Sequence, residues 1–212
     1  PSSPLGQAQP GLGEWVDALA LALNAAGVLD LAYEPLRLQG RLALRDGQRD
    51  RVWQLWTPNK ALGLTGIRAA YAIAPVDPGG SALQEQVERL ASSWPLGAHS
   101  VALLDAWATD GVQRWLAQSR ETLRRWKGTQ QALLCDVLGW TCLPSDANFF
   151  CARPALPSGV TLQQALAGLR AHGIKLRDCI SFGLTGHVRI SVQAPDAQHS
   201  LHDAWRQLVE AG

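Results

Sequence analysis

The sequence predicts an α/β fold in its first half and a smaller α+β part in its second half. Three observations predict this fold class. Apolar residues recur at helical spacing in several stretches, short apolar runs lie between them, and turns rich in glycine or proline separate both. Strand, turn and helix that alternate along a chain are typical of an α/β layer.

The first half begins with a predicted helix. Trp15, Leu19 and Leu23 fall on one side of it, and Gly27 is a stop signal. We predict a helix over 11–26, a buried strand in VLDLAY (28–33), an alternating strand in RVWQLW (51–56), the turn TPNKALGLTG (57–66) and a third apolar run, IRAAYAIAP, which ends at Pro75.

The second half carries longer helical stretches and short strands. Trp115, Leu123 and Trp126 lie along one side of the segment 111–139, which therefore predicts one long helix. We also predict helical segments at 81–92 and roughly 98–135, short strands at about 139–143 and 148–153, a helix at about 161–172, a strand at 187–193 and a terminal helix at about 196–210. This mixture is typical of an α+β domain.

The composition excludes several classes of function. The chain has 212 residues, of which 47% are apolar and 17% are charged, and its formal net charge is +1. Because Lys and Arg form no block, we predict neither a nucleic-acid partner nor a membrane partner. The longest apolar runs are too short to span a bilayer, and no secretory signal is visible.

The cysteines indicate the cellular compartment. They are Cys135, Cys142, Cys151 and Cys179. Their spacing matches no zinc pattern, so we predict no metal site. Scattered free thiols favour a reducing compartment, and we therefore predict a cytoplasmic location.

The turn around Lys60 is the first candidate for chemistry. Thr57 lies three residues before Lys60 and Arg68 lies eight residues after it, while Gly63 and Gly66 allow the backbone to come close to a ligand. A hydroxyl, a cation and free backbone N–H groups can hold a phosphate. An amine beside a phosphate site suggests attack on a phosphorylated aldehyde. The alternative is a surface loop with an ordinary Lys and an ordinary Arg.

A carboxylate and a phenol precede this turn. Asp30 lies in the predicted apolar strand VLDLAY, where a carboxylate requires a partner. Tyr33 follows three residues later, where the strand ends. A turn Asp beside a core Tyr is the commoner arrangement, but the presence of Lys60 thirty residues later favours a shared site.

In this order the residues resemble the fold-type I aminotransferases, which use pyridoxal phosphate. The matching patterns are Asp-x-x-Tyr at 30–33, Thr-x-x-Lys at 57–60 and Gly-x-Arg at 66–68. The nearest branch is the histidinol-phosphate aminotransferase-like group, which includes threonine-phosphate decarboxylases.

The resemblance implies a role for each residue of the first half. Lys60 is expected to bond to the aldehyde of the cofactor and then to act as the general base. Asp30 is expected to pair with the pyridine nitrogen and Tyr33 to hydrogen-bond the ring 3-oxygen. Thr57 and Arg68 are expected to hold the cofactor phosphate.

The opening segment PSSPLGQ departs from the family pattern. It falls where the family carries an Asn-Pro-Thr-Gly-like turn, and Ser3 stands in place of an Asn that contacts the ring 3-oxygen. A hydroxyl offers fewer contacts than an amide. Ser3 is therefore expected to bind the cofactor with fewer contacts.

The second half resembles the same family in two segments. SDANFF (145–150) resembles a Ser-x-x-Asn-Phe strand, which implies that Asn148 binds substrate. GIKLRDCISFGLTGHVRISV (173–192) resembles the closing segment. There Arg189 matches the Arg that grips a substrate carboxylate, and Arg177 matches a second Arg that helps to bind an acidic group.

The resemblance also implies the domain organisation. Residues 1–100 are expected to form the C-terminal portion of a large, three-layer α/β/α cofactor-binding domain. Residues 101–212 are expected to form a long connecting helix and a small α+β domain. The chain resembles the C-terminal two thirds of such an enzyme, and its lack of Met agrees with this expectation. The first third of the family carries a phosphate loop and a ring that stacks on the cofactor.

The implied function is that of a homodimeric, pyridoxal-phosphate-dependent aminotransferase that acts on a small amino acid or amino-acid phosphate. One alternative, favoured by the wording RDC-x-SFGL, is a threonine-phosphate decarboxylase-like enzyme of cobalamin biosynthesis. Another, favoured by Ser3 and by the missing first third, is an incomplete scaffold domain without catalysis.

Overall fold

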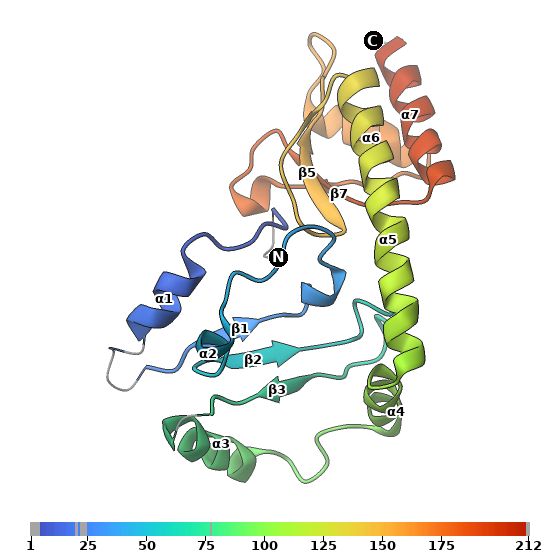
Figure 1. Ribbon diagram of the computed structural model, residues 1–212. Helices are drawn as coiled ribbons and strands as arrows, with labels where there is room; N and C mark the ends of the chain where they lie inside the picture. Colours follow the sequence, from blue (N-terminus) through green and yellow to red (C-terminus); the bar gives the residue numbers. More distant parts are fainter. Residues whose placement is uncertain (1–4, 20, 22–24, 77, 211–212) are drawn as a thin grey trace. The chain divides into compact units, whose positions relative to one another are not determined.

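Two compact units make up the chain in the computed structural model, which describes residues 5–19, 21, 25–76 and 78–210. Unit 1 comprises Pro1–Gln7 and Ser119–Gly212, and unit 2 comprises Ala8–Gln118. Each unit contains its own sheet and helices (Figure 1). The predicted α/β class is therefore confirmed, whereas the division into domains at residue 100 stays a prediction.

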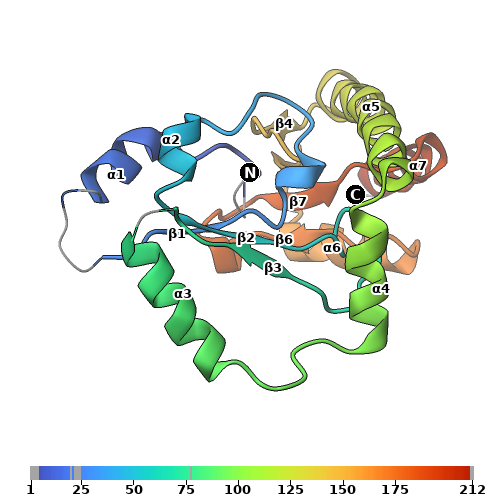
Figure 2. The same cartoon turned by 60° about the horizontal axis from the view of Figure 1, so that its bottom comes forward.

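The sheet of unit 2 has three strands in the order β1-β2-β3. β1 (Val28–Asp30) and β2 (Trp53–Trp56) are parallel, and β3 (Tyr71–Ile73) runs antiparallel to β2. The three strands lie side by side in Figures 1 and 2. They lie within the three apolar runs of the sequence, of which the first two were predicted as strands. β1 was predicted to be buried, but Val28 and Asp30 are exposed and Leu29 is half-buried.

The helices of unit 2 pack on this sheet in part. They are α1 (Leu12–Leu19), the 3₁₀ turn η1 (Glu34–Leu36), α2 (Asp46–Arg49), α3 (Pro78–Leu90), α4 (Ala98–Trp107) and the first residues of α5 (Asp110–Ala132). Val16, Leu44 and Val52 form one buried cluster. From Ser81 onward the side chains of α3 are exposed or half-buried.

The sheet of unit 1 has four strands in the order β4-β5-β7-β6, and all of its pairings are antiparallel. The strands are β4 (Thr141–Cys142), β5 (Phe149–Arg153), β6 (Arg177–Asp178) and β7 (Val188–Ser191). Phe150, Val188 and Ile190 are buried in this sheet. The alternation of β7 is of the kind that antiparallel sheets with one covered face produce.

Helices complete unit 1. They are the rest of α5, the π-helical turn η2 (Leu133–Val137), α6 (Leu162–Ala171), the 3₁₀ turn η3 (Ile180–Phe182) and α7 (Pro195–Glu210). Thr161 caps α6, because its side chain accepts a hydrogen bond from the Gln164 amide. The rings of Trp140 and Trp205 meet edge to face at 4.6 Å in the core.

Several element boundaries differ from the sequence predictions. The helical stretch predicted over 98–135 is interrupted after α4, and the Thr109 hydroxyl caps α5 by accepting the Val112 amide at 3.4 Å. α1 ends at Leu19, and part of the predicted helix beyond it lies outside the described residues. β6 and α2 are too short to show a period and were not predicted. Among the described helices, none has both the length and the apolar character that crossing a bilayer requires.

Candidate functional site

One edge of the unit 2 sheet collects most of the residues predicted to carry chemistry. β1 and β2 are parallel and end together, with Asp30 opposite Leu55. β3 runs the other way and therefore begins at this edge, with Tyr71 opposite Trp56. The chain just after β1, just after β2 and just before β3 consequently meets there. In open α/β sheets, ligands bind at the carboxyl ends of the parallel strands.

Lys60 lies on a single helical turn directly after β2. Pro58 occupies its start, where a fixed φ and a missing N–H are tolerated. Gly63 ends it with a φ of 68°. The Gly63 amide donates to the Lys60 carbonyl at 3.3 Å, and the Leu64 amide donates to the Asn59 carbonyl at 2.9 Å. These two bonds form a Schellman motif, which explains the sequence TPNKALG.

Gly63 and Gly66 were both expected to allow a close approach of the backbone, and the structure gives another reason for Gly63. A Cβ at either glycine meets nothing within 4 Å. Gly63 is required because its backbone is left-handed, a conformation that costs other residues about 1–2 kcal/mol. Gly66 has no such requirement.

The amine of Lys60 is available for chemistry. Its side chain is exposed, and Nζ lies 4.3 Å from the centroid of the Tyr33 ring. Tyr33 is half-buried and packs against the cluster of Leu36, Ala61 and Leu116, which fixes the ring. Within the described residues, no hydrogen bond or ion pair to the Lys60 amine occurs. A cation over an aromatic face gains about 0.5–1 kcal/mol at an exposed site, so the contact places the amine without consuming its donors.

Asp30 has a different environment from the one predicted. It is the last residue of β1 and its side chain is exposed, so it does not require a buried partner. Its Oδ1 accepts a hydrogen bond from the Ala32 amide at 2.9 Å, which orients the carboxylate at the strand end. The other carboxylate oxygen has no partner among the described residues and can accept a proton donor on a ligand.

Thr57 and Arg68 lie on either side of the same edge. Thr57 Oγ1 is 2.7 Å from the Ala69 carbonyl and 2.7 Å from Oδ1 of Asn59. A hydroxyl has one proton, so it can donate to one of these oxygens, and the other contact requires the Asn59 amide to present its nitrogen. The Arg68 side chain is exposed, while its carbonyl accepts the Ser100 hydroxyl at 2.7 Å.

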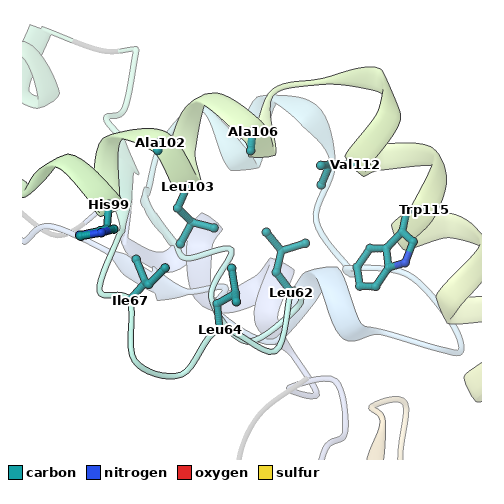
Figure 3. Close-up of a pocket in the computed structure, with 9 residues that line it drawn as sticks. All are labelled: Leu62, Leu64, Ile67, His99, Ala102, Leu103, Ala106, Val112 and Trp115. Atoms are coloured by element: carbon teal, nitrogen blue, oxygen red, sulfur yellow. The ribbon is translucent and has the colours of Figure 1, made fainter.

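An apolar hollow of about 490 Å³ lies behind the Lys60 turn (Figure 3). Leu62 and Ile67 line it from the turn, Leu103 lines it from α4, and Trp115 lines it from α5. Among its described lining residues, His99 is the one with an ionisable side chain. The hollow therefore supplies packing surface beside the Lys60 turn and little acid–base chemistry.

A second set of predicted residues lies in unit 1. Arg177 and Arg189 are directly opposite each other on β6 and β7. Both guanidinium groups lie over the ring of Phe182, at 5.4 Å and 5.2 Å, and Arg189 also lies 5.2 Å from the ring of Phe149. Arg177 donates to the Ser181 hydroxyl at 3.2 Å. Like charges directly opposite each other are destabilising, and a bound anion relieves this repulsion.

Asn148 lies directly before β5 in the same unit. Its backbone carbonyl accepts the Val192 amide at 2.8 Å, which fixes it at the end of the β5–β7 pairing. Its side-chain Oδ1 is buried and has no hydrogen-bond partner. An unsatisfied buried acceptor costs about 1–3 kcal/mol, so this oxygen is a candidate to accept a donor on a ligand.

Two thiols beside Arg189 were not recognised as a pair in the sequence. Cys151 is opposite Arg189 on β5, and its Sγ lies 3.8 Å from the Sγ of Cys179. Burial is the largest cause that raises the pKa of Cys179 to about 12, and burial also raises the pKa of Cys151. These thiols are therefore protonated and serve as packing. No signal in the sequence marks the pair, because 27 residues separate them.

The predicted site residues thus fall into two sets. The structure brings Asp30, Tyr33, Thr57, Lys60 and Arg68 to the strand edge of unit 2. It brings Arg177, Arg189 and Asn148 to the sheet of unit 1, although no contact of Asn148 with the two arginines is observed. Ser3 lies outside the described residues. The sequence prediction missed Phe182, which lies under both arginines, and Asn59, which holds Thr57.

Comparisons with known proteins identify the family of the chain. Residues 1–202 match the family model of aminotransferases of class I and II. The chain is 31% identical over 192 residues to the histidinol-phosphate aminotransferase of Halorubrum lacusprofundi, covering 90% of this chain and 48% of that protein. The chain thus spans about half the length of this curated relative.

Solved structures share the fold. The histidinol-phosphate aminotransferase from Sinorhizobium meliloti, determined in complex with pyridoxal-5'-phosphate, has a TM-score of 0.75 at 24% identity and covers 99% of this chain and 55% of that chain. The L-threonine-O-3-phosphate decarboxylase from Porphyromonas gingivalis has a TM-score of 0.73 at 17% identity, over 99% of this chain and 62% of that chain. The fold alone therefore does not separate the two activities. The family model matches residues 1–202, and the chain belongs to the family of class I and II aminotransferases.

Proposed function

We propose that the protein containing this chain is a pyridoxal-phosphate-dependent aminotransferase that moves an amino group between a phosphorylated amine of the histidinol-phosphate type and a 2-oxo acid. The observation that carries this proposal is the Lys60 amine, exposed and over the Tyr33 ring at the edge where β1 and β2 end. The curated relatives named as histidinol-phosphate aminotransferases support the substrate class.

The donor set at this edge fits pyridoxal phosphate. Lys60 offers an amine to the aldehyde, Asp30 offers a carboxylate oxygen to the ring nitrogen, and Tyr33 offers a phenol to the ring oxygen. Thr57 and Arg68 offer a hydroxyl and a guanidinium to the phosphate. When bound, the cofactor supplies a ring that takes up negative charge from the substrate Cα.

Lys60 has two tasks in this proposal. Its amine would bond to the cofactor aldehyde in the resting protein, with loss of water, and once freed it would move a proton to or from the substrate Cα. Both tasks need a neutral amine that no other group holds, and among the described residues no hydrogen bond or ion pair to the Lys60 amine occurs.

Asp30 and Thr57 hold the cofactor at its two ends. The Asp30 carboxylate, oriented by the Ala32 amide, keeps a proton on the ring nitrogen. Thr57 must release the Ala69 carbonyl before its hydroxyl can donate to a phosphate oxygen, while Asn59 remains in reach. Such a switch requires only a rotation of the hydroxyl hydrogen.

Arg177 and Arg189 bind the acidic group of the substrate. Two guanidinium groups over one ring suit a carboxylate or a phosphate, which accepts several charge-assisted hydrogen bonds at once. Asn148 accepts a hydrogen bond from a donor on the same substrate through its unpaired Oδ1.

The proposal is tested with the full-length protein, pyridoxal phosphate, histidinol phosphate and 2-oxoglutarate. We expect glutamate to form, and we expect Arg189→Met to raise KM about tenfold to a hundredfold through lost charged hydrogen bonds. L-Threonine O-3-phosphate is supplied in parallel. Release of CO2 from it without glutamate would replace the proposal with a decarboxylase, and the absence of both products would favour a scaffold.

Three further assignments belong to this proposal. Residues 1–100 complete a large cofactor domain, and the remainder forms the small domain with its connecting helix. The protein is a homodimer, which light scattering of the full-length protein tests. A cytoplasmic location is supported by the free thiols of all four cysteines.

A further inference from the structure

We propose that Lys127 is a positioning residue that fixes Asn148 for substrate binding by holding the turn 145–147. This inference rests on the proposed function, because it assigns Asn148 to the substrate. The observation that supports it is the buried amine of Lys127, which donates hydrogen bonds to the turn directly before Asn148.

Lys127 lies on α5 and only 2% of its surface is exposed. Its Nζ donates to the carbonyl of Ser145 and, at 2.9 Å, to the carbonyl of Ala147. Burial lowers the pKa of Lys127, and the nearby Asp146 carboxylate opposes this effect. An amine keeps at least two N–H donors in either protonation state, so both bonds persist.

Two backbone amides of the turn also have hydrogen-bond partners. The Asp146 amide donates to the Gly6 carbonyl at 2.8 Å, and the Ala147 amide donates to the Ser145 hydroxyl at 3.1 Å. A Cβ added to Gly6 would lie 2.4 Å from the Ser145 hydroxyl oxygen, so Gly6 lies directly against the turn. Gly6 and Lys127 of α5 thus both contact the turn.

Gln130 lies one helical turn after Lys127 and holds the strand opposite Asn148. Its side chain donates to the Ser191 carbonyl at 3.2 Å and accepts the Gln193 amide at 3.0 Å. Residues three apart on a helix share a face. One face of α5 thus fixes the chain on both sides of Asn148: the preceding turn through Lys127 and the paired strand end through Gln130.

Stability alone does not explain a lysine at this position. A buried cation is costly, and this cost offsets part of the free energy that its two hydrogen bonds contribute. What an apolar residue cannot supply is a pair of donors that set the direction of two carbonyls. The orientation of the neighbouring Asn148 amide, whose Oδ1 is buried and unpaired, depends on that direction.

The test is a double-mutant cycle in the full-length protein with Lys127→Met, Asn148→Ala and the double variant. Lys175→Met, at an exposed lysine of the same unit, is the control. All are assayed with histidinol phosphate and 2-oxoglutarate at a temperature where each is folded. We expect Lys127→Met to raise KM about tenfold with a smaller change in kcat. The double variant should match Asn148→Ala within about twofold, as expected for coupled residues.

Two results would overturn the inference. A KM within about twofold of wild type in Lys127→Met would leave Lys127 with a structural role alone. Effects of the two single changes that multiply in the double variant would show that Lys127 does not act through Asn148. If Lys127→Met does not fold, Lys127→Gln takes its place. Because Gln keeps two N–H donors, its KM should stay within about twofold of wild type, and a tenfold rise of KM in this variant would overturn the inference.

Failure of the proposed function is recognised separately. If the wild-type protein forms no glutamate, the function is wrong, and the positioning claim is read from the side-chain amide signal of Asn148 in a selectively ¹⁵N-asparagine-labelled protein. That signal should move or broaden in Lys127→Met and stay unchanged in Lys175→Met. An unchanged signal in both would reject the positioning claim as well.

Discussion

Lys60 in unit 2 and Lys127 in unit 1 present the same functional group in opposite environments. Lys60 is exposed, and its amine lies 4.3 Å over the Tyr33 ring. Lys127 is buried, and its amine donates to two backbone carbonyls. The residue type is the same, so the surroundings alone decide whether an amine is free for chemistry or committed to the fold.

The comparison shows how the elements around each lysine create these surroundings. A capped helical turn after β2 presents Lys60 at the strand edge, where no carbonyl of the described residues accepts a hydrogen bond from the amine. Lys127 lies near the C-terminal end of α5 and is buried in unit 1, where desolvation makes unpaired polar groups costly. The chain has one further lysine, Lys175, which is exposed.

The largest difference between the two lysines is expected in their effect on kcat. Lys60→Ala should lower kcat by about 10²–10⁴-fold, the range for loss of a general base, because no other described amine lies at the strand edge. Lys175→Ala should leave kcat unchanged and serves as the control. Steady-state kinetics on histidinol phosphate measure both. A Lys60→Ala variant with wild-type kcat would contradict the assignment.

The reverse pattern is expected in stability. Lys127→Met leaves two buried carbonyls without donors, each worth about 1–3 kcal/mol, although removal of a buried charge offsets part of this loss. The free energy of unfolding should therefore fall by about 2 kcal/mol or more in urea titrations. Lys60→Ala should change it by less than about 0.5 kcal/mol, as at other surface positions. An equal loss of unfolding free energy in Lys127→Met and Lys60→Ala would contradict the proposed difference between the two lysines.

The smallest effect is expected from the turn that presents Lys60. Gly63→Ala places a side chain at a φ of 68° and should destabilise the turn by about 1–2 kcal/mol. Gly66→Ala is a matched control, because its added Cβ also meets nothing within 4 Å and its φ is not positive. Thermal unfolding compares the two. An equal effect of both changes would show that the Schellman motif does not hold the turn.

Much of the strand edge could be predicted from the sequence, because its residues follow apolar runs in order. Asp30 lies in the first run, Thr57 and Lys60 follow the second, and Arg68 lies at the start of the third, so pairing of these runs in one sheet gathers them. The environment of Asp30 could not be predicted, since a strand of three residues gives no signal for the point where it ends.

The contacts of unit 1 were less accessible to sequence reasoning. β6 has only two residues, so its sequence shows no periodic pattern that predicts a strand. The pairing of Arg177 with Arg189 therefore could not be predicted. Lys127 lies in a helix rich in charged residues, where a solvated face is the ordinary expectation. Its burial is a result of tertiary packing, which local patterns do not encode.

The central claim is that Lys60 bonds to the cofactor aldehyde. Identifying the lysine that carries the cofactor tests this claim most directly. The full-length protein is loaded with pyridoxal phosphate, reduced with borohydride to make the bond permanent, and digested with trypsin for mass spectrometry. The account predicts the mass of the reduced cofactor on the peptide 52–68, which contains Lys60, and its absence in Lys60→Ala. The same mass on Lys127, on Lys175 or on any other lysine, or no added mass at all, would contradict it.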